Sequence, residues 1–98
     1  MRLSPPMIAA IKAAAVEAFG GDAVVRLFGS RVDDQARGGD IDLHIEASPD
    51  RADIHHEVRF RTALWKALDE EQLDVVVEAR GRPQRWIDRA AHREGIVL

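Results

Sequence analysis

The sequence predicts an α/β domain, with a small mixed β-sheet and helices packed on one face of it. Two segments, residues 40–46 and 73–78, alternate between apolar and polar side chains, which is typical of strands with one buried face. Segments with apolar residues at helical spacing stand before, between and after them. The chain has 98 residues, enough for one core and too few for a second. We therefore expect residues 1–98 to form a single domain.

The first third of the chain predicts a helix, a strand and a tight turn. Ser4 followed by Pro5-Pro6 is typical of a helix N-cap with prolines in the first turn, and the helical spacing continues to Gly20-Gly21. Residues 23–28 are short, apolar and rich in β-branched side chains, and Gly29 ends them. A polar segment, residues 31–39, then leads to the first alternating strand.

The rest of the chain predicts a helix, a second alternating strand and a last helix. One face of the first of these helices, from about Arg51 to Glu70, carries five side chains at spacings of three and four: Ile54, Val58, Arg61, Trp65 and Leu68. Pro83 opens the last helix and Gly95 ends it, leaving residues 96–98 as a short apolar tail. An apolar stripe is expected along that helix, formed by Trp86, Ile87, Ala90 and Ala91.

Composition excludes several classes of protein. There is no cysteine, so no disulfide framework or thiolate zinc site is expected. The net charge of −3 provides no overall attraction for nucleic acid, which is therefore not an expected partner. No segment approaches the roughly 20 apolar residues of a membrane span, and the N-terminal segment does not resemble a signal peptide. We expect a cytoplasmic protein, and the sequence leaves its oligomeric state open.

Three aspartates carry the strongest indication of chemistry. Alternation places Asp40 and Asp42 side by side on one strand face, about 6.8 Å apart, and Asp74 joins them if its strand lies beside theirs. Carboxylates are the ligands that Mg²⁺ prefers, and two such ions roughly 3.5 to 4 Å apart can hold a triphosphate and activate a hydroxyl. The sequence therefore predicts a site for two Mg²⁺ ions at these aspartates, where Asp74 binds the catalytic ion or accepts a proton.

The turn that precedes the aspartates is suited to binding phosphate. Gly29 allows the backbone to approach phosphate oxygens, and the Ser30 hydroxyl and the amides that follow can donate hydrogen bonds to them. Arg31 either reaches a phosphate or is solvated. Gly29, Ser30 and Arg31 are therefore the candidate nucleotide-binding residues.

Together, these motifs resemble the signature of the minimal nucleotidyltransferases of the DNA polymerase β superfamily. The resemblance covers nearly the whole chain, because the elements follow in that family's order; the spacer between Ser30 and Asp40 is one residue shorter than in many relatives. It rests on three segments: Phe28-Gly29-Ser30-Arg31, Gly39-Asp40-Ile41-Asp42-Leu43, and Leu73-Asp74-Val75-Val76-Val77. It implies that Gly29 and Ser30 bind the nucleotide phosphates, that Asp40 and Asp42 hold two Mg²⁺ ions, and that Asp74 serves the catalytic ion or acts as base.

The resemblance also implies a reaction and a partner. Members of this size usually work beside a separate helical protein of the HEPN or a related substrate-binding type, and several such pairs are toxin and antitoxin. The leading expectation is an antitoxin that uses ATP and Mg²⁺ to transfer AMP to a tyrosine of its toxin. Two alternatives remain open: a subunit that modifies a small molecule such as an aminoglycoside, and an antitoxin that acts by binding alone through a vestigial site.

Two further features of the sequence are functional candidates. His44 lies on the carboxylate face one step beyond Asp42, and we expect a half-exposed strand histidine. Five arginines lie between Arg80 and Arg93, three of them in a row along the last helix. That row either meets an acidic partner or an RNA, or forms an ordinary solvated face.

Overall fold

Three helices and four strands form the part of the chain that the computed structural model describes, residues 3–29, 41–65, 67 and 73–98. Their order confirms the predicted α/β class with a mixed sheet. Along the chain the elements are α1 (Pro5–Phe19), β1 (Val24–Phe28), β2 (Ile41–Ala47), α2 (Ile54–Trp65), β3 (Leu73–Ala79), α3 (Trp86–Glu94) and β4 (Ile96–Val97).

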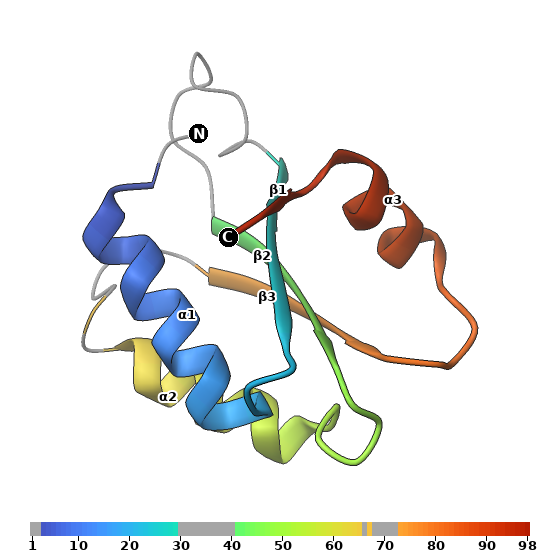
Figure 1. Cartoon of the computed structure of the whole chain (residues 1–98), viewed down its shortest axis with the longest axis horizontal. Helices are drawn as coiled ribbons and strands as arrows, with labels where there is room; N and C mark the ends of the chain where they lie inside the picture. Colours follow the sequence, from blue (N-terminus) through green and yellow to red (C-terminus); the bar gives the residue numbers. More distant parts are fainter. Residues whose placement is uncertain (1–2, 30–40, 66, 68–72) are drawn as a thin grey trace.

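The strands form one sheet in the order β3-β2-β1-β4 (Figure 1). β1 runs antiparallel to β2 and to β4, whereas β3 runs parallel to β2. The short tail that the sequence left without a structure is thus β4, an edge strand opposite residues 26 and 27 of β1. Its pairing continues in Leu98, whose backbone N–H donates to the carbonyl of Val25 at 2.9 Å.

α1 begins and ends where its sequence signals predict. The Ser4 hydroxyl accepts a hydrogen bond from the Met7 amide at 3.3 Å, the prolines occupy the first two helical positions, and Gly20 caps the C-terminus. Across the ranges that the structure describes, no helix combines the length and the apolar character needed to cross a membrane.

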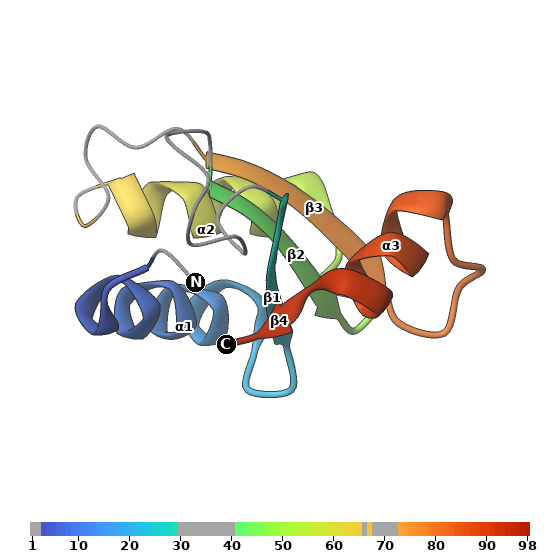
Figure 2. The same ribbon diagram turned by 90° about the horizontal axis from the view of Figure 1, so that it is seen from above.

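The core lies between one face of the sheet and the helices α1 and α2 (Figure 2). The apolar side chains of β2, at positions 41, 43 and 45, are fully buried, as the alternation predicts. Against them pack Ile11 and Phe19 of α1 and Phe60 and Leu64 of α2. The rings of Phe19 and Phe60 meet at a centroid distance of 5.7 Å, which joins the two helices.

α2 differs from its prediction in its start and in the face that it buries. It begins at Ile54 rather than near Arg51, and Trp65 is its last helical residue in the described part of the chain. Phe60 and Leu64 point into the core, whereas three apolar residues of the predicted stripe lie outward: Ile54 is 63% exposed, Val58 52% and Trp65 71%. The fourth, Leu68, lies outside the described residues. Phe60 and Leu64 are also four residues apart, so the helix offers two apolar faces and spacing alone does not choose between them.

α3 packs on the opposite face of the sheet from α1 and α2, so the expectation that the helices lie on one face holds for α1 and α2 but not for α3 (Figure 2). It lies over His44, which is fully buried, so the expectation of a half-exposed histidine is wrong. The predicted apolar stripe of this helix is also wrong in part, because Trp86 is 73% exposed. Ala91 of the stripe is buried as expected, but the helix also buries Asp88, since the sheet face beneath it is polar.

The burial of Phe60 gives a test of this packing. Phe60→Ala should lower the free energy of unfolding by about 3 to 5 kcal/mol, because it removes a fully buried ring and leaves a cavity between the helices. Val58→Ala, two residues away on the exposed face, should change it by about 0.5 kcal/mol or less. Urea denaturation followed by circular dichroism measures both, and equal effects would contradict the assigned faces of α2.

Candidate functional site

One edge of the sheet brings together the predicted site residues that the structure describes. β1 ends at this edge, and β2 and β3 both begin there (Figure 1). Asp42 lies opposite Phe28 of β1 on one side and in register with Asp74 of β3 on the other. Neighbouring strands are about 4.8 Å apart and in-register side chains point to the same face, so the two carboxylates start from adjacent positions. β3 therefore lies beside β2, as the role predicted for Asp74 requires.

Gly29 is fitted to the carboxylate of Asp42. Its φ of +78° lies in the left-handed region, which glycine adopts without a steric penalty. A Cβ atom at this position would overlap the Oδ2 atom of Asp42. Both the backbone conformation and the space thus require glycine here, which links the turn after β1 to the first carboxylate of the site.

The other predicted site residues, Ser30, Arg31 and Asp40, lie outside the described residues. Their roles in binding phosphate and metal stay predictions. The geometry on which the site rests is therefore that of Gly29, Asp42 and Asp74.

A cation lies beside this edge of the sheet. Arg61 of α2 donates from Nη1 to the carbonyl oxygen of Leu73 at 2.9 Å, and from Nε to Glu57 at 3.2 Å. These bonds fix the guanidinium at the start of β3, one residue before Asp74. Its side chain remains 40% exposed. The guanidinium thus lies near the backbone at the start of β3, although α2 packs on the sheet face opposite the side chains of Asp42 and Asp74.

A second polar cluster lies further along the same sheet face, beneath α3. The Nε2 atom of His44 is 2.9 Å from Oδ1 of Asp88 and 3.2 Å from Oε1 of Glu78. The Nε2 atom of His92 is 2.8 Å from the same Oε1 of Glu78 and 3.6 Å from Oε1 of Glu46. Two strands and one helix thus bring two imidazoles and three carboxylates together.

Arginines neutralise two of these three carboxylates. Burial would raise the pKa of Asp88, but hydrogen bonds from the side chain and backbone of Arg85, and the contact with His44, hold it far below its ordinary value. Burial acts on Glu46 in the same direction, and hydrogen bonds from Arg80 and Arg26 lower its pKa overall. Both groups are therefore charged at neutral pH.

Glu78 is the exception among the three carboxylates. It is only 7% exposed, and within the described residues no arginine or lysine nitrogen lies within ion-pair distance of it. Its hydrogen-bonding partners are His92 and the amide of Gln84, whose Nε2 donates at 3.2 Å, and Nε2 of His44 lies 3.2 Å from its Oε1 atom. The Nδ1 atom of His44 is buried without a hydrogen-bond partner in the described structure.

Sequence reasoning missed this cluster, although part of its signal was present. Asp88 and His92 are four residues apart in the last helix, so they share one face of it. His44 and Glu78 were each assigned to the polar side of a strand. What the sequence could not supply is the crossing of α3 over that side, which buries His44, Glu78 and Asp88.

The arginine row has local partners. Arg85 donates to Asp88, Arg89 donates to the carbonyl of Gln84 at 2.9 Å, and Arg93 pairs with the neighbouring Glu94 at 3.1 Å. Arg80, upstream of the row, binds Glu46 and Asp22. Arg80 and Arg85 therefore stabilise the fold through ion pairs with the carboxylates of Glu46 and Asp88. The row gives no specific indication of an acidic partner or an RNA.

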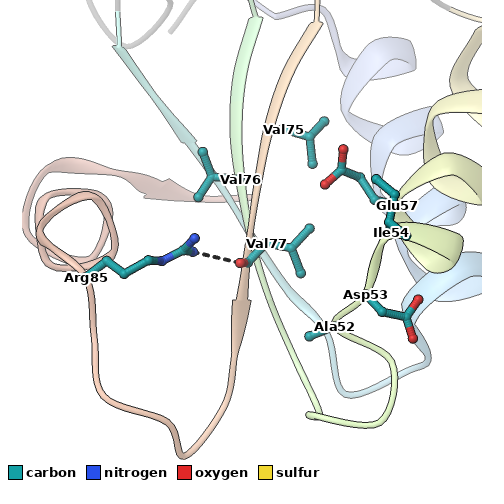
Figure 3. Close-up of a pocket in the computed structure, with 8 residues that line it drawn as sticks. All are labelled: Ala52, Asp53, Ile54, Glu57, Val75, Val76, Val77 and Arg85. Carbon is teal, nitrogen blue, oxygen red and sulfur yellow. Dashed lines mark hydrogen bonds between the residues drawn. The ribbon is translucent and has the colours of Figure 1, made fainter.

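A shallow groove runs along the outer edge of β3 (Figure 3). Val75 and Val77 point toward α2 in this view, whereas Val76 points toward α3, and Arg85 donates to the carbonyl of Val77 at 2.7 Å. Neither Gly29, Asp42 nor Asp74 lines this groove. The groove is thus separate from the carboxylate edge, the end of the sheet at which Gly29, Asp42 and Asp74 lie.

The fit between Gly29 and Asp42 predicts a specific cost of substitution. Gly81 also has a positive φ, +88°, but a Cβ there meets nothing within 4 Å. Gly81→Ala should therefore lower stability by about 1 to 2 kcal/mol, the backbone penalty alone. Gly29→Ala should lower it further, because Asp42 must also move. Urea denaturation measures the loss of stability in each variant, and the difference between the two isolates the cost of the overlap with Asp42. Equal losses of stability would contradict that overlap.

Neither a protein-family model nor a curated protein matches this chain, so the arrangement of Gly29, Asp42 and Asp74 is itself the basis on which a function is proposed.

Proposed function

We propose that this chain is a Mg²⁺-dependent nucleotidyltransferase that transfers AMP from ATP to a hydroxyl group of a partner protein. The observation that supports it most is the in-register pairing of Asp42 with Asp74, next to a turn at Gly29 where a Cβ atom would overlap the Asp42 carboxylate. An aspartate is a poor strand former, so two of them side by side in neighbouring strands favour a role in binding.

The donor set fits magnesium. Asp42 and Asp74 offer carboxylate oxygens from adjacent strands, and Asp40 precedes Asp42 by one strand period in the sequence. When bound, Mg²⁺ would neutralise the charge of the triphosphate and of the departing pyrophosphate. Asp40, Asp42 and Asp74 are the residues proposed to hold two such ions.

The chain's own residues would then position the reactants. Gly29 and Ser30 bind the phosphates through backbone amides and a hydroxyl, and Arg31 contributes positive charge. The acceptor oxygen forms a bond to the α-phosphorus, and the bond from that phosphorus to the pyrophosphate oxygen breaks. Asp74 accepts the hydroxyl proton directly or serves the catalytic ion. The products are an AMP ester of the acceptor and pyrophosphate.

The acceptor is proposed to belong to another chain. A domain of 98 residues has little surface for a second walled pocket beside a nucleotide site. α2 presents Ile54, Val58 and Trp65 to solvent, an apolar face that suits contact with a helical protein of the HEPN type. In this proposal the partner is a toxin, its modified group is a tyrosine, and the pair works in the cytoplasm, where ATP is available.

Magnesium dependence of nucleotide binding gives the first test of the site. ATP should bind with Mg²⁺ and far more weakly in EDTA, because the triphosphate otherwise faces the charges of Asp42 and Asp74. Asp42→Asn should reduce transfer by about 100-fold or more, the scale of losing one electrostatic group at a transferring phosphoryl. Glu17→Gln, the same change at an exposed position of α1, should alter neither. Isothermal titration calorimetry measures the affinity of the chain for ATP with Mg²⁺ and in EDTA. Equal affinities under the two conditions would refute the metal site.

Transfer to a partner protein gives the second test. A candidate helical toxin incubated with this chain, ATP and Mg²⁺ should gain one or more AMP groups, visible in its intact mass. Asp42→Asn should abolish the modification and leave the complex intact, because this residue serves chemistry rather than docking. An unmodified partner that is still neutralised by the variant would replace transfer with the binding-only alternative. Modification of an aminoglycoside and of no protein would favour the small-molecule alternative.

A further inference from the structure

Three atoms that commonly bind transition metals converge beneath α3. They are Nε2 of His44, Oε1 of Glu78 and Nε2 of His92, and all lie within 4.8 Å of one another. Both imidazole nitrogens approach the same carboxylate oxygen, at 3.2 and 2.8 Å. Ligand atoms around a tetrahedral Zn²⁺, each about 2.0 to 2.1 Å from the metal, lie about 3.3 Å from one another. The two separations from Oε1 of Glu78 are thus close to those of a metal site.

From this arrangement we propose that His44, Glu78 and His92 bind one Zn²⁺ ion, which fastens α3 to the polar face of the sheet. This site is distinct from the proposed magnesium site, although His44 follows Asp42 by one strand period. Its ligands differ in kind, because imidazole nitrogen favours Zn²⁺ and related ions whereas Mg²⁺ takes oxygen ligands.

The charge balance of the cluster supports a bound cation. Asp88 and Glu46 have arginine partners in direct contact, whereas among the described residues the buried Glu78 has only the longer-range attraction of Arg85. A buried carboxylate without a fixed counter-charge is unfavourable. A divalent ion at its Oε1 atom would supply the missing positive charge, and the two imidazoles already face that atom.

The way α3 is held supports the same conclusion. Of its nine residues, Ala91 and Asp88 are the buried ones, and alanine contributes little hydrophobic stabilisation. The helix therefore depends on its polar contacts with β2 and β3, which are those of Asp88 with His44 and of His92 with Glu78. A metal that joins ligands from both strands and the helix would replace weak contacts with strong ones.

Asp88 lies beside the site but is not one of the three converging ligand residues. Its Oδ1 atom is 2.9 Å from Nε2 of His44, and Arg85 holds the carboxylate in place through Oδ1 and Oδ2. A metal on Nε2 moves the remaining proton of His44 to Nδ1, which has no partner in the described structure. That unpaired N–H leads us to expect weaker binding than in a zinc finger.

Metal titration of the whole chain tests the proposal. Protein freed of metal by a chelator and then dialysed should bind one Zn²⁺ per chain in isothermal titration calorimetry, and Mg²⁺ should not compete for the site. His92→Ala should weaken Zn²⁺ binding at least about tenfold. The side chain of His92 is 30% exposed, so this variant should fold, as circular dichroism will verify. His55→Ala, an exposed histidine of α2, is the matched control and should bind as the wild type does.

The same titration distinguishes the two proposed sites. Zinc binding that persists in Asp42→Asn and is weakened in His92→Ala supports the cluster beneath α3. Binding that is lost in Asp42→Asn and unchanged in His92→Ala would assign the ion to the aspartates and overturn the proposal, as would no binding by the wild type. Co²⁺ gives an independent readout: a four-coordinate site with nitrogen ligands produces strong visible absorption, which should disappear in His92→Ala.

Discussion

The strict alternation of β2 is the constraint on which the rest of the structure depends. Its apolar side chains, Ile41, Leu43 and Ile45, are fully buried against α1 and α2. The same alternation sends Asp42, His44 and Glu46 to the opposite face, where they meet β3 and α3. A shift of one residue in register would place carboxylates in the core and apolar groups in the polar clusters. The core and both candidate sites therefore share a single register.

Much of the fold could be predicted because its signals are local. The N-cap at Ser4, the glycine that follows α1 and the alternation of β2 and β3 each specify structure within a few residues. The residues of the carboxylate edge were likewise found from spacing. Their adjacency needed one further condition, the parallel pairing of β2 with β3, which depends on the α2 crossover rather than on either strand alone.

The errors came from contacts between distant elements. The outward stripe of α2 has the same spacing as its buried pair Phe60 and Leu64, so the choice of face is made by Phe19 across the core. The burial of His44 depends on α3, which lies more than forty residues further along the chain. In α3 the apolar stripe does not mark the buried side, because the sheet face beneath the helix is polar and accepts Asp88 while Trp86 stays exposed.

The arginines beside β3 have a consequence for the behaviour of the protein in concentrated solution. As an edge strand, β3 presents outward carbonyl groups that another molecule could use to extend the sheet. Arg61 takes the carbonyl of Leu73 and Arg85 that of Val77, so two carbonyls of this strand are already bonded to positively charged side chains. An incoming strand would have to displace both guanidinium groups. The same side chains that brace the two helices therefore protect this edge against intermolecular strand pairing, and hence against aggregation.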